Sequence, residues 1–152
     1  MSPVSPTLRQ SNVGRLMFNA ARQFEEAIYA DVRAAGFPEI RFVHLTLTRN
    51  MDSGGTRLTQ LAARAGMTKQ AMSELVDQCE AIDIVERRPD PSDRRARIIV
   101  FTSRGHKLLR ALIAGIARAE ADMRAAIGAE TFKIVAAALR LYCVAETQRK
   151  IA

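Results

Sequence analysis

Thr56 to Gly105 reads TRLTQLAARAGMTKQAMSELVDQCEAIDIVERRPDPSDRRARIIVFTSRG, and it contains the most informative pattern of helices, turns and strands in the chain. Apolar residues recur at helical spacing over 58–65 and again after Thr68, and Gly66-Met67 separates the two segments. Thr68 suits a helix N-cap, because its hydroxyl accepts a hydrogen bond from a free amide of the first turn. Two helices joined by a short glycine-containing turn are typical of a helix-turn-helix.

A β-hairpin is predicted directly after this helix pair, where the helical spacing ends. The segments Ile84–Arg88 and Ala96–Phe101 are short and rich in apolar, β-branched residues, which is typical of strands. Between them, Pro89–Arg95 (PDPSDRR) has the proline, aspartate and serine content of a turn. We therefore expect two strands with a polar tip that projects from the helices.

Helices are predicted on both sides of this stretch. The spacing of apolar residues favours a helix from about Ser11 to Gly36, one over 39–51, a long one over 103–127 and a last one over 130–148. The last helix is apolar on two faces, and a second subunit is the economical cover for one of them; packing between two neighbours of its own chain is the alternative. The fold class expected is mainly α with a small β-hairpin wing.

Length and composition place the chain in one broad class. It has 152 residues, 48% of them hydrophobic and 26% charged, and this length predicts one domain over residues 11–152 after a flexible, proline-containing tail over 1–10. Two cysteines and the lack of an N-terminal apolar run argue against a disulfide-built secreted domain. With no segment of about 20 consecutive apolar residues, the sequence predicts a cytoplasmic protein that does not enter a membrane.

The charge distribution points to a polyanionic partner. The formal net charge is +7, and the segment 94–119 contains seven Lys and Arg residues and no Asp or Glu. A basic surface on a small domain most often binds nucleic acid.

The start of the second helix of the pair carries side chains suited to reading DNA, namely Thr68, Lys69, Gln70 and Ser73. Gln pairs with adenine, hydroxyls donate or accept, and Lys reaches guanine or phosphate. A capped and solvated first turn is the alternative for these four residues taken alone.

The hairpin adds arginines to this picture. Arg94, Arg95 and Arg97 lie at or next to its expected tip, and arginines on a projecting arm enter narrow minor grooves. Asp90 and Asp93 are expected to close the turn and to orient a neighbouring arginine. A solvated turn with charges that serve solubility is the alternative.

The quoted stretch resembles the winged helix-turn-helix of the MarR family of bacterial transcription regulators. The most specific part is DPSDRRAR, followed by apolar residues and then by Thr102 and Gly105. The resemblance extends through the flanking helices from about Ser11. By position, Thr68, Lys69, Gln70 and Ser73 correspond to the start of the family's recognition helix, and Asp93, Arg94 and Arg95 to its wing. Cys79 stands where the family usually has Leu, and Asp83 where it has Gly.

The resemblance implies a homodimer on double-stranded DNA. Residues 11–51 and 103–152 would form the dimerisation region, and 56–101 the winged lobe. It implies an inverted-repeat operator, usually repression, and release by a small molecule or by cysteine oxidation. The peroxide-sensing members use a cysteine in the first helix, which this chain lacks, so Cys79 in the core and Cys143 in the last helix are weak redox candidates.

Some family members bind aromatic acids or phenols between the dimerisation helices and the winged lobe. The candidates for such a ligand pocket in this chain are Met17, Tyr29, Arg41 and His44. An ordinary surface or core role for the histidine is the alternative.

Other function classes receive little support from the sequence. Two histidines without zinc-site spacing predict no metal, and DSGGT at 52–56 is neither a nucleophile elbow nor a phosphate loop, so we expect no enzyme and no cofactor. The remaining alternative is a helical adaptor that binds proteins and not DNA.

Overall fold

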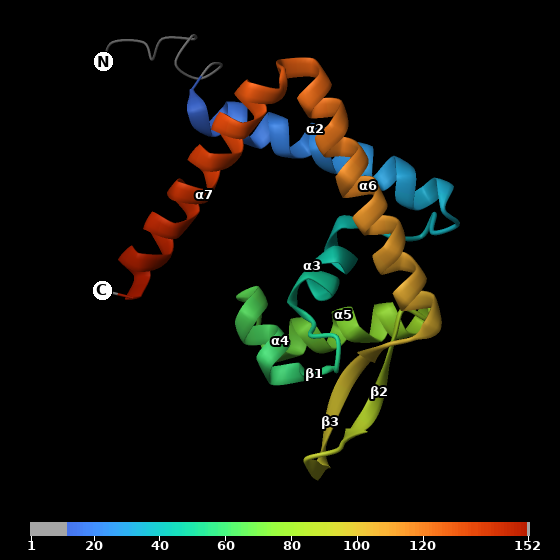
Figure 1. Cartoon of the computed structure of the whole chain (residues 1–152). Helices are drawn as coiled ribbons and strands as arrows, with labels where there is room; N and C mark the ends of the chain where they lie inside the picture. The colour runs from blue at the N-terminus through green and yellow to red at the C-terminus, as the bar shows by residue number, and fades with distance from the viewer. Residues whose placement is uncertain (1–11, 152) are drawn as a thin grey trace, which may run out of the picture. The chain divides into compact units, whose positions relative to one another are not determined.

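The computed structural model describes residues 12–151, except for the side chains of Arg94 and of 145–151. The tail predicted over 1–10 lies outside the described residues. The elements follow the order α2 (Val13–Ala34), α3 (Phe42–Asn50), β1 (Thr56–Arg57), α4 (Leu58–Ala65), α5 (Lys69–Ala81), β2 (Val85–Asp90), β3 (Asp93–Phe101), α6 (Ser103–Ile127) and α7 (Ala129–Ile151) (Figure 1). The fold class is confirmed as mainly helical with a small antiparallel sheet.

The chain forms two compact units, and their boundary falls inside α6. The first unit extends to Gly115 and contains α2 to β3 with the first half of α6, and the second begins at Ile116 and contains α7. No helix within residues 12–151 has both the length and the apolar character needed to cross a membrane.

The turn between α4 and α5 forms as the local sequence predicts. Gly66 adopts a left-handed conformation with φ 64°, and the amides of Gly66 and Met67 donate to carbonyls of the last turn of α4. Thr68 is the N-cap of α5, and its Oγ1 accepts a hydrogen bond from the Ala71 amide at 3.1 Å. The predicted helix-turn-helix is therefore confirmed, with α4 over the predicted residues.

One face of α5 builds the core of the lobe, and the opposite face remains exposed. The buried side chains of α5 are Met72, Leu75, Val76 and Cys79, which have the helical spacing that the sequence shows after Thr68. They share the core of the first unit with Leu61, Ile84, Ile99 and Leu108, all of which are at most 1% exposed. Burial raises the pKa of the Cys79 thiol to about 11, so this thiol stays protonated and unreactive.

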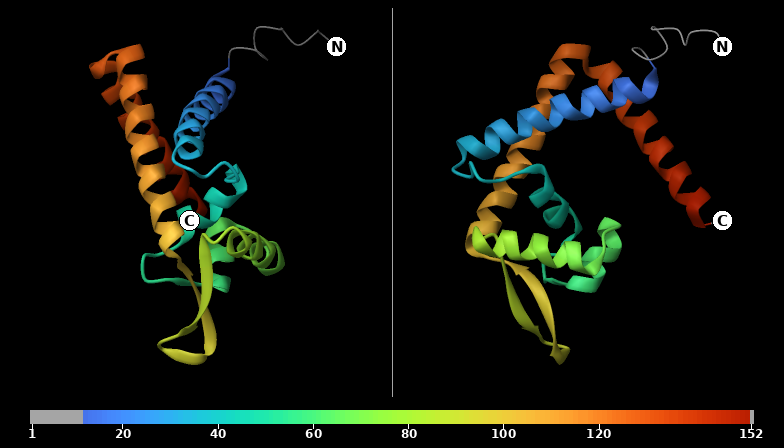
Figure 2. Two further views of the ribbon diagram at one scale, coloured as in Figure 1. Left: turned by 90° about the vertical axis from the view of Figure 1, so that its right-hand side faces the viewer. Right: turned by 180° about the vertical axis from the view of Figure 1, so that it is seen from behind.

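The hairpin is longer than predicted, and it has a third strand beside it. The sheet order is β1-β3-β2, with Thr56 opposite Ile99 on one side of β3 and Val85 opposite Phe101 on the other. Pairing continues to Asp90 and Asp93, so the turn is only Pro91-Ser92 and the predicted turn over 89–95 is too long. Pro89 is tolerated in β2 because β2 is an edge strand. The hairpin extends beyond α4 and α5 in both figures (Figure 1, Figure 2).

The base of the hairpin is closed by a tight junction with α6. Asp83 adopts a left-handed conformation with φ 57°, which the family resemblance allowed for at this position. The Thr102 amide then donates to the Ile84 carbonyl at 3.1 Å, and Thr102 Oγ1 accepts from the Gly105 amide at 2.9 Å. These bonds bring the first turn of α6 against the end of the α5–β2 connection.

The second helix is shorter than the predicted 39–51, because it starts only at Phe42. Glu39, which precedes it, forms an ion pair with Arg104 at the start of α6. The Arg104 guanidinium also lies 4.9 Å from the ring centre of the buried Phe37. Residues before α3 are thus held by α6 in an irregular segment instead of continuing the helix.

In the second unit, α7 begins directly after Gly128, which has φ 84° and ends α6. Arg124 lies 4.6 Å from the ring centre of Phe132, which packs the two helix ends together. Ile134 and Leu141 remain 69% and 74% exposed. The second apolar face predicted for the last helix is therefore uncovered within its own unit.

Candidate nucleic-acid interface

The predicted reading residues lie at the exposed start of α5. Lys69 and Gln70 are exposed, and Ser73, one turn further, is half-buried. Thr68 is exposed as well, although its Oγ1 is already used as the cap of the helix. Lys69, Gln70 and Ser73 thus remain available for contacts outside the chain.

The Gln70 side chain is oriented by a neighbour that the sequence prediction did not include. Its Nε2 donates to Oε1 of Glu74 at 3.3 Å, and both side chains are exposed. A carboxylate only accepts hydrogen bonds, so the amide nitrogen of Gln70 must face Glu74. Oε1 and one N–H of Gln70 remain available.

The wing arginines lie on strand β3 and not in the turn. Arg95 and Arg97 are exposed, and their spacing of two residues places them on the same face of the strand. Oδ1 of Asp93 accepts a hydrogen bond from the Arg95 amide at 3.0 Å, which holds the backbone where β3 begins. Arg94 belongs to β3, and its side chain lies outside the described residues.

The tip of the hairpin is anchored to the start of α4 by Arg57, Asp90 and Ser92. Nε and Nη2 of Arg57 both lie 2.6 Å from Oδ2 of the buried Asp90. Oδ1 of Asp90 accepts from the Ser92 amide at 2.8 Å and from its hydroxyl at 2.7 Å. Asp90 therefore closes the turn, and the arginine it binds is Arg57 of β1, not one of the wing.

This anchoring predicts a dependence of stability on acid pH. The two hydrogen bonds from Ser92, together with Arg57, lower the pKa of Asp90 from 3.8 to about 2. The contribution of the ionised carboxylate is fully present above pH 3.8 and is lost as the pH falls toward 2. We expect an Asp90→Asn variant to be less stable than the wild type at neutral pH.

The two proteins should converge in stability as the pH falls toward 2, because the wild-type carboxyl takes up its proton over this range. Urea unfolding of both proteins from pH 7 to pH 2 measures this difference. A stability gap that stays constant over that range would show that the charge of Asp90 does not hold the wing.

Arg87 of β2 connects the hairpin to two acidic residues of α5, the exposed Asp77 and the half-buried Glu80. Its Nη2 lies 2.8 Å from Oδ1 of Asp77, and its Nη1 forms an ion pair with Glu80. The Arg87 amide also donates to Oε1 of Glu80 at 2.9 Å. The base of the wing and the second half of α5 are therefore held together by charge.

Of the candidate ligand residues, the structure brings Arg41 and His44 together. The Arg41 amide donates to Nδ1 of His44 at 3.2 Å, so in the neutral ring Nε2 carries the proton. His44 is 3% exposed, and Nε2 has no hydrogen-bond partner in the described part of the chain. Burial, and then the charge of Arg41, lower the pKa of His44. The Arg41 guanidinium contacts Oε1 of Gln78 on α5 at 3.4 Å.

Tyr29 and Met17, the other two candidates, have different surroundings on α2. Glu25 and Arg49 are the charged groups that act on Tyr29, and burial, followed by Glu25, raises its pKa to about 12. The Tyr29 hydroxyl is buried and has no hydrogen-bond partner among residues 12–151. Met17 is 39% exposed. No described contact joins either residue to Arg41 or His44.

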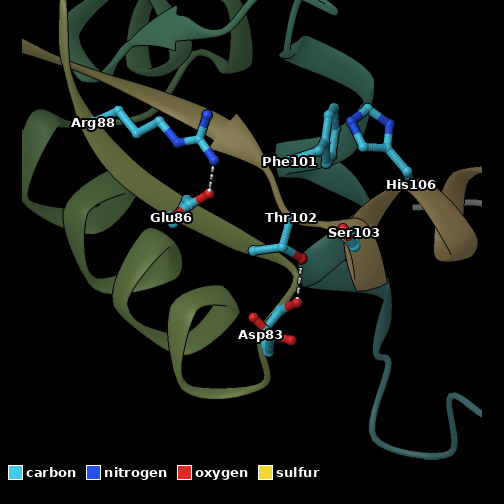
Figure 3. A pocket seen from close by; sticks show the side chains of 7 residues that line it. All are labelled: Asp83, Glu86, Arg88, Phe101, Thr102, Ser103 and His106. Atoms are coloured by element: carbon cyan, nitrogen blue, oxygen red, sulfur yellow. Dashed lines mark hydrogen bonds and ion pairs between the residues drawn. The ribbon is translucent and has the colours of Figure 1, made fainter.

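Two surface hollows flank the hairpin. One lies at its base, between the end of α5 and the start of α6, and is lined by Asp83, Glu86, Arg88, Phe101, Thr102, Ser103 and His106 (Figure 3). The other lies beside the turn and is lined by Gly54, Gly55, Arg57, Gln60, Asp90, Pro91, Ser92 and Ile98. Asp90 is the predicted site residue that lines one of them. The described side chains contain no group of three or more His, Cys, Asp or Glu residues that could hold a metal ion.

Arg57, Glu74 and Arg87 are the residues of this surface that sequence reasoning missed. For Glu74 the signal was present, because it follows Gln70 by four residues on the same helix face. Arg57 and Asp90 are 33 residues apart, and the pairing of both β1 and β2 with β3 brings them together.

Residues 47–96, which span α4, α5 and most of the hairpin, match the model of the MarR family. No curated protein matches the sequence.

Solved structures share the fold at low identity. The repressor CouR bound to a 23-mer DNA duplex has a TM-score of 0.65 and 23% identity, covering 93% of this chain and 99% of that chain. CouR from Rhodococcus jostii RHA1 bound to p-coumaroyl-CoA has a TM-score of 0.66 and 22% identity, covering 90% and 94%. The regulator PcaV from Streptomyces coelicolor, in complex with its natural ligand, has a TM-score of 0.61 and 21% identity, covering 96% and 99%.

The family match covers the segment that forms the helix-turn-helix and the wing, and the fold similarity covers nearly the whole chain. On these two findings, residues 47–96 are similar to the MarR family, and the chain as a whole has the winged helix-turn-helix fold of these solved structures.

Proposed function

We propose that this chain is a sequence-specific regulator of transcription that binds double-stranded DNA. The observation that carries the proposal is the exposed polar start of α5 beside a projecting hairpin with exposed Arg95 and Arg97. A helix-turn-helix places the first residues of its second helix against base edges in the major groove. CouR, which has the same fold, has been solved on a DNA duplex, and this supports the proposal.

The assignment of residues follows from this geometry. Lys69, Gln70 and Ser73 would contact bases or phosphates, and Thr68 would hold the start of the helix. Arg94, Arg95 and Arg97 would contact the adjacent groove and backbone, where arginines favour narrow minor grooves. Asp90 and Asp93 would hold the wing in position.

The regulator would act as a homodimer on an inverted repeat. Large apolar side chains are exposed on helices of both units, and such patches mark interfaces between proteins. They are Val13, Leu16 and Phe18 on α2, and Ile134, Leu141, Tyr142 and Val144 on α7. We assign residues 11–51 and 103–152 to dimerisation and 56–101 to the winged lobe. Two-fold symmetry then sets the recognition helices about 34 Å apart, one turn of DNA.

Repression released by a small aromatic acid is the regulation that we propose, in the cytoplasm where such a repressor meets its DNA. Arg41 offers a guanidinium, and His44 offers a buried Nε2–H without a partner among the described residues. A carboxylate accepts from both groups. Met17 and Tyr29 would line the apolar side of the pocket. Ligand complexes of CouR and PcaV support this proposal.

Salt-dependent binding to duplex DNA tests the function. We expect the affinity for an enriched duplex to fall by orders of magnitude between about 50 mM and about 200 mM salt, because neutralised phosphates release counterions. A double variant with Arg95→Ala and Arg97→Ala should bind more weakly and flatten the slope of log K against log salt by about two. Sedimentation should give twice the monomer mass of 16.8 kDa.

A helical adaptor would give other results. It would bind duplex DNA weakly, without a steep loss of affinity on adding salt. A salt slope that the wing variant leaves unchanged would remove the hairpin from the interface. A monomer at micromolar concentration would contradict the proposed dimer.

A further inference from the structure

Helix α5 has the wrong charge for a helix that enters a polyanion. It reads KQAMSELVDQCEA, with Lys69 as its one base against the three carboxylates of Glu74, Asp77 and Glu80. A carboxylate near the DNA backbone repels phosphates. Each of the three acids therefore weakens binding unless a cation of the protein neutralises it or it makes a favourable contact with a base.

Two of these acids are already neutralised from within the protein. Arg87 pairs with Asp77 at 2.8 Å and with Glu80, and these acids lie on the second half of the helix. Glu74 differs from them, because no described side chain forms an ion pair with it. Its carboxylate is exposed, and the Gln70 amide donates to it at 3.3 Å.

The position of Glu74 makes it a neighbour of the proposed reading residues. It lies one helical turn beyond Gln70 on the same face. The hydrogen bond between them fixes the direction of the Gln70 amide and occupies part of one carboxylate oxygen of Glu74. The second oxygen, Oε2, remains free to accept a hydrogen bond from outside the chain.

The chemistry of base edges then selects a partner for this oxygen. In the major groove, cytosine offers an N4 amino donor, guanine offers only acceptors at N7 and O6, and thymine offers an acceptor and a methyl group. Adenine has a donor at N6, but its neighbouring N7 is an acceptor that faces a second acceptor on a carboxylate. A carboxylate therefore suits cytosine, whereas the amide of Gln suits adenine.

We propose that Glu74 determines specificity by accepting a hydrogen bond from the N4 amino group of a cytosine in each operator half-site, next to the base pair that Gln70 contacts. The inference rests on the proposed DNA-binding function. Glu74 would act mainly by lowering the affinity for other sequences, and less by raising the affinity for the cognate site. On the cognate site the carboxylate is paired, and on other sequences it meets acceptors and phosphates without a donor, which penalises the wrong sites.

The test compares base preferences of the full-length protein and its variants. Duplexes are selected from a random pool with wild type, Glu74→Ala and Glu74→Gln, and affinities are measured for the enriched duplex with each base pair at each position. The control is Asp52→Asn, which removes one carboxylate in the loop before β1 whose side chain is 57% exposed. Glu74 is itself exposed, so its variants should fold.

Wild type and control should prefer C·G at one position of each half-site. Glu74→Ala should lose about tenfold or more of that preference while it binds unrelated duplexes more tightly, and Glu74→Gln should move the preference toward A·T. If both variants bind all duplexes more tightly with unchanged preference at every position, Glu74 only repels phosphates and the inference is wrong. If the wild type binds no duplex in a salt-dependent way, the proposed function fails as well.

Discussion

Replacing Gly105 by alanine should lower the free energy of unfolding by about 3 kcal/mol or more. A Cβ at this position would lie 2.0 Å from the Ile84 carbonyl oxygen and 3.1 Å from the Phe101 ring. The Ile84 oxygen is not free to move, because it accepts a hydrogen bond from the Thr102 amide, and the Thr102 hydroxyl donates to the neighbouring Asp83 carbonyl at 2.5 Å. The clash can be relieved only if α6 moves away from the base of the hairpin. The new methyl group therefore destabilises the packing of the whole lobe.

Gly115 of the same helix provides a matched control for this substitution. A Cβ at Gly115 would meet Ile28 at 3.4 Å, which is an ordinary contact distance. In a helix interior, alanine is more favourable than glycine by about 1 kcal/mol. Gly115→Ala should therefore leave the free energy of unfolding unchanged or raise it slightly.

Urea unfolding of both variants, followed by far-UV circular dichroism at one protein concentration, measures the difference. Equal midpoints for the two variants would mean that the α6 junction has room at Gly105 and that the close approach to Ile84 is not a constraint on the fold.

Local chemistry explains why so much of the lobe was predictable. The left-handed Gly66 and the Thr68 cap fix the ends of α4 and α5 with interactions inside a few residues, so the sequence contains the information. The inward residues of α5 follow from helical spacing alone. The hairpin followed from strand composition and turn chemistry, and the family resemblance added the expected division of the chain into a winged lobe and a dimerisation region, which periodicity does not predict.

The parts that sequence reasoning missed depend on distant partners. Strand β1 has two residues, too few for any alternation, and exists because β3 pairs with it. The end of β2 was assigned to a turn because prolines normally interrupt strands, yet an edge strand accommodates Pro89. Asp90 was expected to bind a neighbouring arginine, and tertiary pairing supplies Arg57 instead.

The same limit applies to the candidate ligand pocket. Arg41 and His44 are close in sequence and lie together at the start of α3. Tyr29 was grouped with them by its chemistry, but the charged groups that act on it are Glu25 and Arg49. Spacing along a helix does not show which neighbouring helix a side chain meets.

Replacing Arg87 by alanine should weaken DNA binding by about fivefold or more without removing any group that touches DNA. Arg87 neutralises Asp77 and Glu80, and its side chain is only 25% exposed. Without it, two carboxylates on α5 face the duplex uncompensated, and each repels a phosphate about 8 Å away by about 0.5 kcal/mol even at the dielectric constant of water. Stability should fall by about 1 kcal/mol, since the ion pairs are partly exposed.

A background with Asp77→Asn and Glu80→Gln separates this explanation from a direct contact. The amide side chain introduced by Glu80→Gln retains an oxygen that accepts from the Arg87 amide, so the backbone connection survives. In this background Arg87→Ala should cost little affinity, because the side chains at positions 77 and 80 then carry no charge that repels phosphates. The difference between the effects of Arg87→Ala in the two backgrounds is the coupling energy, and it measures how much repulsion Arg87 prevents.

Salt gives a second measure of the same effect. The loss caused by Arg87→Ala should shrink as the ionic strength rises toward 1 M, where charges are screened within about 3 Å. If the loss is equally large in the neutralised background, Arg87 itself contacts the duplex. If there is no loss at any salt concentration, the acidic half of α5 faces away from DNA, and only the first turn of the helix enters the groove.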